Sequence, residues 1–281
     1  MRILIAGGTG MLGIDLVEAL SHHDVVSTGS AQLDIRDPEA CRDAVRGIDA
    51  IVNCAAYTRV DDAEADEEAA FALNAQGAAN LAAAAAEQGA VLVQVSTDYV
   101  FRGDAREPYA EDAAVDPVSA YGRTKAEGER LAVEANPDTI VVRTAWLYGR
   151  GGPSFPATML RLAGQRETLD VVDDQRGQPT WTRDLAGAIR ALLEAGVRSG
   201  TFHGTNAGEA TWFDLARAVL EEAGLDPERV RPTDSASFVR AAPRPAWSVL
   251  AHDAWAARGL APMRPWREAL HEAVARGEVA A

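Results

Sequence analysis

The first thirteen residues, MRILIAGGTGMLG, constrain the fold more than any other segment of the chain. An apolar strand candidate, Arg2–Ala6, leads into glycines at positions 7, 10 and 13, which open a helical stretch. Gly7 permits a tight turn, Gly10 lets the backbone approach a pyrophosphate, and Gly13 lets the helix lie close to the sheet. A strand before and a helix after are the context that a dinucleotide-binding turn requires. We therefore predict a cofactor-binding turn rather than a purely structural one.

The rest of the first half alternates short β-branched runs with helical stretches, which is typical of parallel sheets built from βαβ units. We predict an α/β fold, a Rossmann-type doubly wound parallel sheet with a smaller C-terminal substrate lobe. Residues 1–150 and about 168–205 would form the cofactor domain, and about 151–167 and 206–281 the lobe. The strand candidates are Arg2–Ala6, Asp24–Thr28, Ala50–Cys54, Val91–Ser96 and Ile140–Ala145. The helix candidates are Met11–Ser21, Pro38–Arg46, Ala63–Gln88, Ser119–Asn136, Ala157–Gly164, Thr182–Ala195, Thr211–Ala223 and Trp266–Arg276.

Charge limits the classes of partner. The chain has 27 basic and 42 acidic residues, a net charge of −15, and such a protein repels nucleic acid and anionic membranes. The acidic run 61–68 is expected to form a solvated helix start favoured by the helix dipole. The two cysteines and five histidines show no metal-ligand spacing, so no metal site is expected. The N-terminus lacks the features of a secretory signal, and we expect a cytoplasmic protein.

The end of the second strand bears on the type of cofactor. Enzymes that use NAD usually place an acidic residue there to hold the ribose hydroxyls. This chain has Ser27-Thr28-Gly29-Ser30 instead, with no acidic residue until Asp34. Small hydroxyl residues admit a 2′-phosphate, although no arginine is adjacent to bind it. The sequence favours NADPH and leaves NADH open.

Tyr121 and Lys125 stand four residues apart on a predicted helix and therefore share one face. Lys125 is the only lysine among the 27 basic residues, which makes its place beside a tyrosine informative. A phenol donates a proton to a developing alkoxide only if its phenolate is stabilised, and a nearby ammonium does this. Thr97 ends the fourth strand, where its hydroxyl can bond a substrate carbonyl or cap the following loop.

Several motifs place these residues in a known family. The 3-and-3 glycine spacing resembles the extended branch of the short-chain dehydrogenase/reductase superfamily. Over nearly its whole length, the chain resembles the dTDP-4-dehydrorhamnose reductase family. The motifs that carry this resemblance are NCAAYTRVDDAE from Asn53, STDYVF from Ser96, YGRTK from Tyr121, RTAW from Arg143, DQRGQPT from Asp174, and Arg244-Pro245. Two segments depart from the family pattern, Pro153-Ser154-Phe155 and Ala246-Trp247.

The resemblance implies NADPH-dependent reduction of the C4 ketone of a dTDP-4-keto-6-deoxyhexose, with dTDP-4-dehydrorhamnose giving dTDP-L-rhamnose. It implies that Thr97, Tyr121 and Lys125 are catalytic, with Tyr121 as the proton donor. The expected cofactor-binding residues are Gly7, Thr9, Gly10, Met11, Leu12, Gly13, Ser30, Asp34, Ile35, Ala55, Ala56, Tyr57, Val95, Tyr121 and Lys125. The expected substrate-binding residues are Thr97, Asp98, Trp146, Arg176 and Arg244, the two arginines being chosen because a guanidinium binds diphosphate with two donors.

Two other functions stay open at this point. One is 4-ketoreduction in another nucleotide-deoxysugar pathway. The other is a non-catalytic regulatory subunit that resembles the β subunit of methionine adenosyltransferase, in which the STDYVF element also occurs. The intact Tyr121/Lys125 pair favours catalysis, because a subunit that only binds a nucleotide has no need for it. Some relatives use Mg²⁺ at a subunit contact, and the sequence leaves open both this ion and a homodimer.

Overall fold

Six parallel strands form the centre of the computed structural model, which describes residues 1–279. They are β1 (Arg2–Ala6), β2 (Asp24–Thr28), β3 (Ala50–Asn53), β4 (Val91–Thr97), β5 (Thr139–Thr144) and β10 (Gly200–His203). Their order in the sheet is β10-β5-β4-β3-β1-β2, so the winding reverses between β1 and β3. The predicted Rossmann-type fold is confirmed, and the five predicted strands agree with the structure to within one residue at either end.

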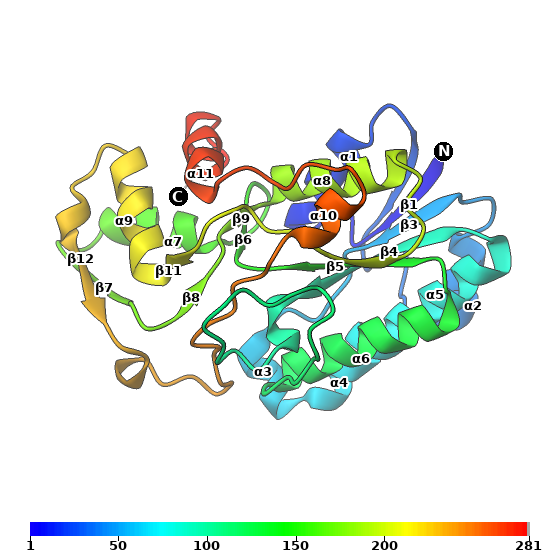
Figure 1. Cartoon of the computed structure of the whole chain (residues 1–281), viewed down its shortest axis with the longest axis horizontal. Coiled ribbons are helices and arrows are strands. Elements are labelled where there is room, and N and C mark those ends of the chain that lie inside the picture. The colour runs from blue at the N-terminus through cyan, green and yellow to red at the C-terminus, as the bar shows by residue number, and fades with distance from the viewer. Residues whose placement is uncertain (280–281) are drawn as a thin grey trace.

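Helices cover both faces of the sheet (Figure 1), and alternate residues of β1 pack against different helices. Ile3 and Ile5 pack in the cluster that contains the buried leucines of α1 (Met11–Ala19) and α8 (Thr182–Glu194). Leu4 packs on the opposite face, with α2 (Pro38–Ala44) and α5 (Gly77–Gln88). Because successive side chains of a strand point to opposite faces, a parallel strand covered on both sides is apolar throughout.

The single regular helix expected over residues 63–88 is wrong, because the chain leaves the helix at Asp66 and a π-helical turn lies within the part that follows. The helical segments are α3 (Val60–Ala65), α4 (Glu67–Phe71), the π-helical turn (Ala72–Gln76) and α5, of which the last three run on without a break. Asp66 ends the first helix at φ −141° and caps the second by accepting from the Ala69 amide. In the π turn, the buried Asn74 side chain accepts from the Tyr57 amide at 2.7 Å and donates to Thr124 at 3.1 Å. These bonds to other segments of the chain hold a π-helical turn that local periodicity does not reveal.

The acidic run at the start of this region is not simply solvated. Glu64 accepts from the Ala120 amide at 2.7 Å, and Glu67 pairs with Arg123. These bonds tie α3 and α4 to α6 (Ala120–Ala135), the helix that carries Tyr121 and Lys125.

The smaller lobe is built on its own apolar cluster, which includes Met159, Leu215 and Leu270. In this structure β7 packs in the lobe by pairing with β12, whereas α8 and β10 pack with the central sheet. The division of the chain predicted from the sequence stays a prediction. Within residues 1–279, the structure contains no helix long and apolar enough to cross a membrane. The lobe elements are β6 (Leu147–Tyr148), α7 (Phe155–Ala163), β7 (Leu169–Val172), β8 (Arg176–Gly177), β9 (Thr180–Trp181), β11 (Ala210–Thr211), α9 (Trp212–Glu222), β12 (Val230–Thr233) and α11 (Trp266–Ala275).

Two helical glycines give a matched test of the packing of α6 against the π-helical turn. A Cβ at Gly128 on α6 would lie 2.1 Å from the Asn74 carbonyl oxygen, so Gly128→Ala should lower the free energy of unfolding by about 2 kcal/mol. Gly187 on α8 faces open space, so Gly187→Ala should raise it by about 0.5–1 kcal/mol. Urea denaturation of both variants measures the difference. Equal stabilities would contradict the close approach of α6 to the π turn.

Candidate functional site

A cavity of about 840 Å³ lies at the carboxyl ends of β1, β3, β4 and β5. This is where the winding of an open α/β sheet reverses and where such folds bind ligands. The lobe closes one side of the cavity with Trp212, the first residue of α9. The cavity wall therefore combines residues from the sheet and from the lobe.

The glycine turn forms one end of the cavity, and its geometry fits a dinucleotide. Gly7 has a φ of +82°, and a Cβ there would lie 2.7 Å from the Ala55 amide nitrogen. A Cβ at Gly13 would lie 2.5 Å from the Gly7 carbonyl oxygen. Gly10 occupies the N-cap of α1 without a side-chain cap, which leaves backbone amides of the first turn open to an anion.

The part of the cavity beyond β2 contains an arginine that the sequence analysis missed. Arg36 lines the cavity together with the predicted Ser30, Asp34 and Ile35. Its guanidinium donates to both carboxylate oxygens of Asp34, at 2.8 and 2.7 Å, and thereby lowers the pKa of that carboxyl. In the sequence, its position two residues after Asp34, a predicted cofactor-binding residue, was the signal that could have identified it. A cation is therefore present on this side of the cavity after all.

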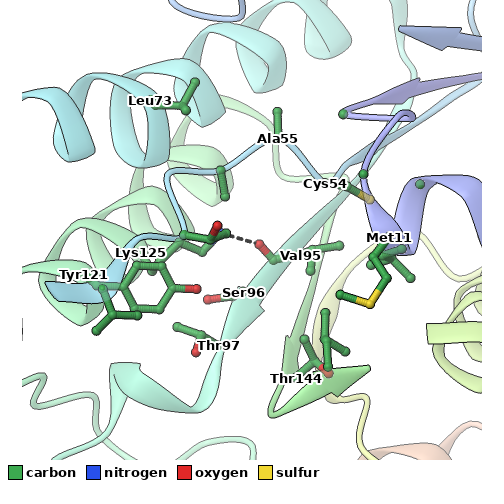
Figure 2. A pocket seen from close by; sticks show the side chains of 18 of the residues that line it. Met11, Cys54, Ala55, Leu73, Val95, Ser96, Thr97, Tyr121, Lys125 and Thr144 are labelled. Carbon is green, nitrogen blue, oxygen red and sulfur yellow. Dashed lines mark hydrogen bonds between the residues drawn. The ribbon is translucent and has the colours of Figure 1, made fainter. Parts of the chain in front are cut away.

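Tyr121 and Lys125 project from the first turns of α6 into the cavity, as expected from their spacing. The Lys125 ammonium donates to the Val95 carbonyl at 2.6 Å (Figure 2). Burial lowers the pKa of Lys125 to about 8, against the opposing charges of Glu129 and Cys54. Burial raises the pKa of Tyr121 to about 12, although the nearby Thr97 hydroxyl works against this shift.

Thr97 and Asp98 lie at the end of β4, close to these two groups. The Thr97 hydroxyl donates to Asp98 at 2.9 Å and accepts from the Tyr99 amide at 3.2 Å, so the expected capping role is also fulfilled. Burial raises the pKa of Asp98 to about 6, opposed by the nearby Ser248 hydroxyl and by the hydrogen bond from Thr97. Because its single proton is already donated, Thr97 can donate to a ligand only after its hydroxyl turns away from Asp98.

Three buried side-chain atoms of the cavity wall have no hydrogen-bond partner among the described residues. They are Ser96 Oγ, Asp98 Oδ2 and Thr144 Oγ1. In Figure 2, the Tyr121 hydroxyl, Ser96 and Thr97 face the same space. Since buried polar groups are almost always paired, these atoms point to a polar ligand.

The structure brings most, but not all, of the predicted residues to the cavity wall. Three predicted residues lie outside it: Tyr57, Arg176 and Arg244. Arg176 pairs with Glu209, and Arg244 pairs with Asp61 at 2.8 Å. Their expected ligand contacts stay predictions. Further wall residues that the sequence analysis did not single out are Thr58, Val60, Leu73, Tyr99, Leu147 and Trp212.

Comparison with known proteins agrees with this geometry. A family model described as the RmlD substrate binding domain matches residues 1–279. The chain belongs to this family. One relative is the "Probable dTDP-4,6-dihydroxy-2-methyloxan-3-one 4-ketoreductase" of Streptomyces antibioticus. It is 53% identical to this chain, over 97% of this chain and 94% of its own length.

A second relative is the dTDP-4-dehydrorhamnose reductase of Mycolicibacterium smegmatis, 49% identical over 98% of this chain and 85% of its own. The crystal structure of dTDP-4-dehydrorhamnose reductase from Bacillus anthracis in complex with NADP is also similar. Its TM-score is 0.94 at 37% identity, and the match covers 98% of this chain and 99% of that one.

The exposed Ser30 gives a direct test of cofactor choice. An aspartate there would repel a 2′-phosphate and could hold ribose hydroxyls instead, so Ser30→Asp should weaken NADPH binding by about tenfold or more and spare NADH. Gly29 is less suitable, because a Cβ there would lie 3.0 Å from Thr9. Fluorescence titration with both nucleotides measures the change, with Ser30→Ala as the control. A parallel loss of NADPH and NADH binding would contradict this assignment of the 2′ position.

Proposed function

We propose that the protein is an NADPH-dependent oxidoreductase that reduces the C4 ketone of a dTDP-4-keto-6-deoxyhexose, with dTDP-4-dehydrorhamnose as substrate and dTDP-L-rhamnose as product. The observation that carries the proposal is the buried Lys125 beside Tyr121 on one helix, both facing a cavity with a glycine cradle at its other end. Burying an ammonium group costs free energy, so a buried lysine without an ion-pair partner is more often found at a functional site. The reductase names of relatives that span almost the whole chain support the chemistry.

The residues present fit the cofactor. The glycine turn and the open first turn of α1 would bind its pyrophosphate, and Ala55 and Ala56 would line the nicotinamide side. NADPH supplies the hydride that adds to C4 of the sugar. Val95 holds one of the three donors of Lys125 through its carbonyl, which leaves two N–H groups for ribose hydroxyls.

Tyr121 would donate the proton to the oxygen at C4. Its pKa, raised to about 12 by burial in the free protein, makes the unassisted phenol a poor acid. The positive charge of Lys125 stabilises the phenolate and so favours proton release as negative charge develops on the substrate oxygen. Thr97 would bond the same oxygen once its hydroxyl turns from Asp98, whose carboxylate can then accept from a sugar hydroxyl.

A second candidate is 4-ketoreduction of a different dTDP-linked sugar. Relatives from Streptomyces antibioticus and Streptomyces niveus, 53% and 51% identical, are named for other keto sugars. Reductases of this kind share the chemistry at C4 and differ in the sugar that they reduce, and this chain departs from the family pattern at Pro153-Ser154-Phe155 and Ala246-Trp247. A purely regulatory, nucleotide-binding role is disfavoured by the buried Tyr121/Lys125 pair. A homodimer and the diphosphate contacts of Arg176 and Arg244 stay predictions.

Product analysis tests the proposal. Incubation of the purified protein with NADPH and dTDP-4-dehydrorhamnose should oxidise one NADPH per sugar and give dTDP-L-rhamnose, identified by NMR. Tyr121→Phe is the matched inactive control. Preferential turnover of dTDP-4-keto-6-deoxyglucose would favour the second candidate, and no turnover of any 4-keto sugar would contradict both.

The lone lysine provides a sharper test of mechanism. Lys125→Arg keeps the charge but replaces a compact ammonium by a wide, planar guanidinium, which a ribose diol and a phenolate accept poorly. We expect kcat/KM to fall by at least about 100-fold, equivalent to about 3 kcal/mol of transition-state stabilisation. The double variant with Tyr121→Phe should be hardly worse than either single variant, because the two groups act together. Steady-state reduction by folded protein measures this, and activity within about threefold of wild type would contradict it.

The pH profile of the same variants gives an independent measurement. Lys125 carries its charge below its pKa of about 8 and loses it as the pH rises through that value. We therefore expect wild-type kcat/KM to fall above about pH 8 and the residual activity of Lys125→Arg to lack this decline. A wild-type profile that stays flat up to the pKa of Tyr121 would show that the charge of Lys125 is not needed.

A further inference from the structure

Trp146, which follows β5, has a backbone conformation that is unusual for a bulky residue. Its φ of +46° is the one positive value of a non-glycine residue among the described residues. Such left-handed conformations are unfavourable for large side chains and persist only where surrounding contacts hold them, often at functional sites. The ring of Trp146 stacks on that of Trp212, with centroids 3.6 Å apart and an interplanar angle of 9°. Phe155 packs against the Trp212 ring at 4.6 Å.

The DQRGQPT segment, residues 174–180, holds this pair in place. A Cβ at Gly177 would lie 2.7 Å from Cε2 of Trp146, so only glycine leaves room for the indole. Gln175 accepts from Trp212 Nε1 at 3.2 Å and donates to the Ser235 hydroxyl at 2.8 Å. Asp174 in turn accepts from the Ser235 amide and hydroxyl, at 2.8 and 2.6 Å. Gly177 and Gln175 therefore contact the two rings directly, and Asp174 supports Gln175 through Ser235.

The pair shares the cavity with the proposed reacting groups. Both tryptophans line the cavity that also contains Thr97 and Tyr121. Thr97 pairs with Thr144 across β4 and β5, and Trp146 comes two residues after Thr144. A sugar whose C4 oxygen lies at Thr97 would extend past the end of β5 toward Trp146. An aromatic side chain packs well against a pyranose, because the C–H groups of the puckered sugar ring form an apolar patch.

We propose that Trp212 is a positioning residue that holds Trp146 against the pyranose ring of the sugar nucleotide, and that Asp174, Gln175 and Gly177 fix the pair. This inference rests on the proposed function for the identity of the ligand. The DQRGQPT segment would then contribute to substrate binding by positioning the two rings, and its own side chains would not need to touch the substrate. It also makes substrate binding depend on the docking of the lobe on the sheet domain, since α9 supplies one ring and the turn after β5 the other.

Trp212→Leu and Trp212→Phe test the proposal, with Phe213→Leu as the matched control on the same helix outside the cavity. We expect Trp212→Leu to raise KM for the sugar nucleotide by about tenfold or more and to leave KM for NADPH within about twofold of wild type. Trp212→Phe keeps an aromatic face and should stay within about threefold of wild type. An unchanged KM for the sugar nucleotide in Trp212→Leu, or an equal rise for NADPH, would overturn the proposal.

Two measurements that need no turnover separate this inference from the proposed function. Stacked indoles give an exciton couplet in the far-ultraviolet circular dichroism spectrum, which should disappear in both Trp212 variants and persist in Phe213→Leu. Calorimetric binding of dTDP alone should be unchanged in Trp212→Leu, since the contact is to the sugar. A couplet missing from the wild type would overturn the stack, and weaker dTDP binding would assign the contact to the base instead.

If Trp212→Leu does not fold, Gly177→Ala provides the same test through the other ring. The added methyl group meets Trp146 directly, so KM for the sugar nucleotide should rise while KM for NADPH does not. An unchanged KM in a folded Gly177→Ala variant would overturn the role of the segment. Failure of the wild type to reduce any 4-keto sugar would contradict the proposed function, whereas the stack of Trp146 on Trp212 is tested separately by circular dichroism.

Discussion

The close contact of the glycine turn with the loop after β3 is the constraint on which the cofactor end of this structure depends. Gly7 lies so near the Ala55 backbone, and Gly13 so near Gly7, that a single methyl group at either position would collide with main chain. This contact lets α1 begin directly beyond the carboxyl end of β1, with the open amides of its first turn facing the cavity. It also lies at the reversal of strand order between β1 and β3, where the carboxyl ends of the strands leave space for a ligand.

The catalytic end depends on a different balance, between burial and charge. Burial moves the pKa of Lys125 down and those of Tyr121 and Asp98 up, so each of the three groups is pushed toward its neutral form. Hydrogen bonding to Asp98 favours its carboxylate, and in the proposed reaction the Lys125 ammonium favours a phenolate at Tyr121. The Val95 carbonyl fixes the ammonium, and Asn74 of the π-helical turn holds the start of α6 through Thr124. Groups with shifted pKa values beside a cavity are typical of functional sites.

The lobe contributes both residues and contacts to the cavity. Through α9 it supplies Trp212 to the cavity wall, and through the segment 238–245 it contacts α3, where Arg244 pairs with Asp61. The Ser248 hydroxyl, which belongs to the predicted lobe, lies near the Asp98 carboxyl and opposes the effect of burial on its pKa. Contacts between the two parts of the chain therefore shape the cavity, and a ligand that touched both parts would stabilise the docking of the lobe.

The sequence by itself determined the sheet, the glycine turn and the Tyr121/Lys125 pair, because each is set by local rules. β-branched runs form strands, glycines permit the turn, and a four-residue spacing places two side chains on one helix face. Tertiary structure alone decided the π-helical turn at Asn74, the partner of Arg244 and the stack of Trp146 on Trp212. In each case the deciding contact is a matter of geometry in space: Asn74 bonds to Thr124, and Trp212 meets a ring 66 positions earlier in the chain. Periodicity and spacing report what neighbours along the chain can do, whereas such contacts exist only once the sheet and the lobe have packed together.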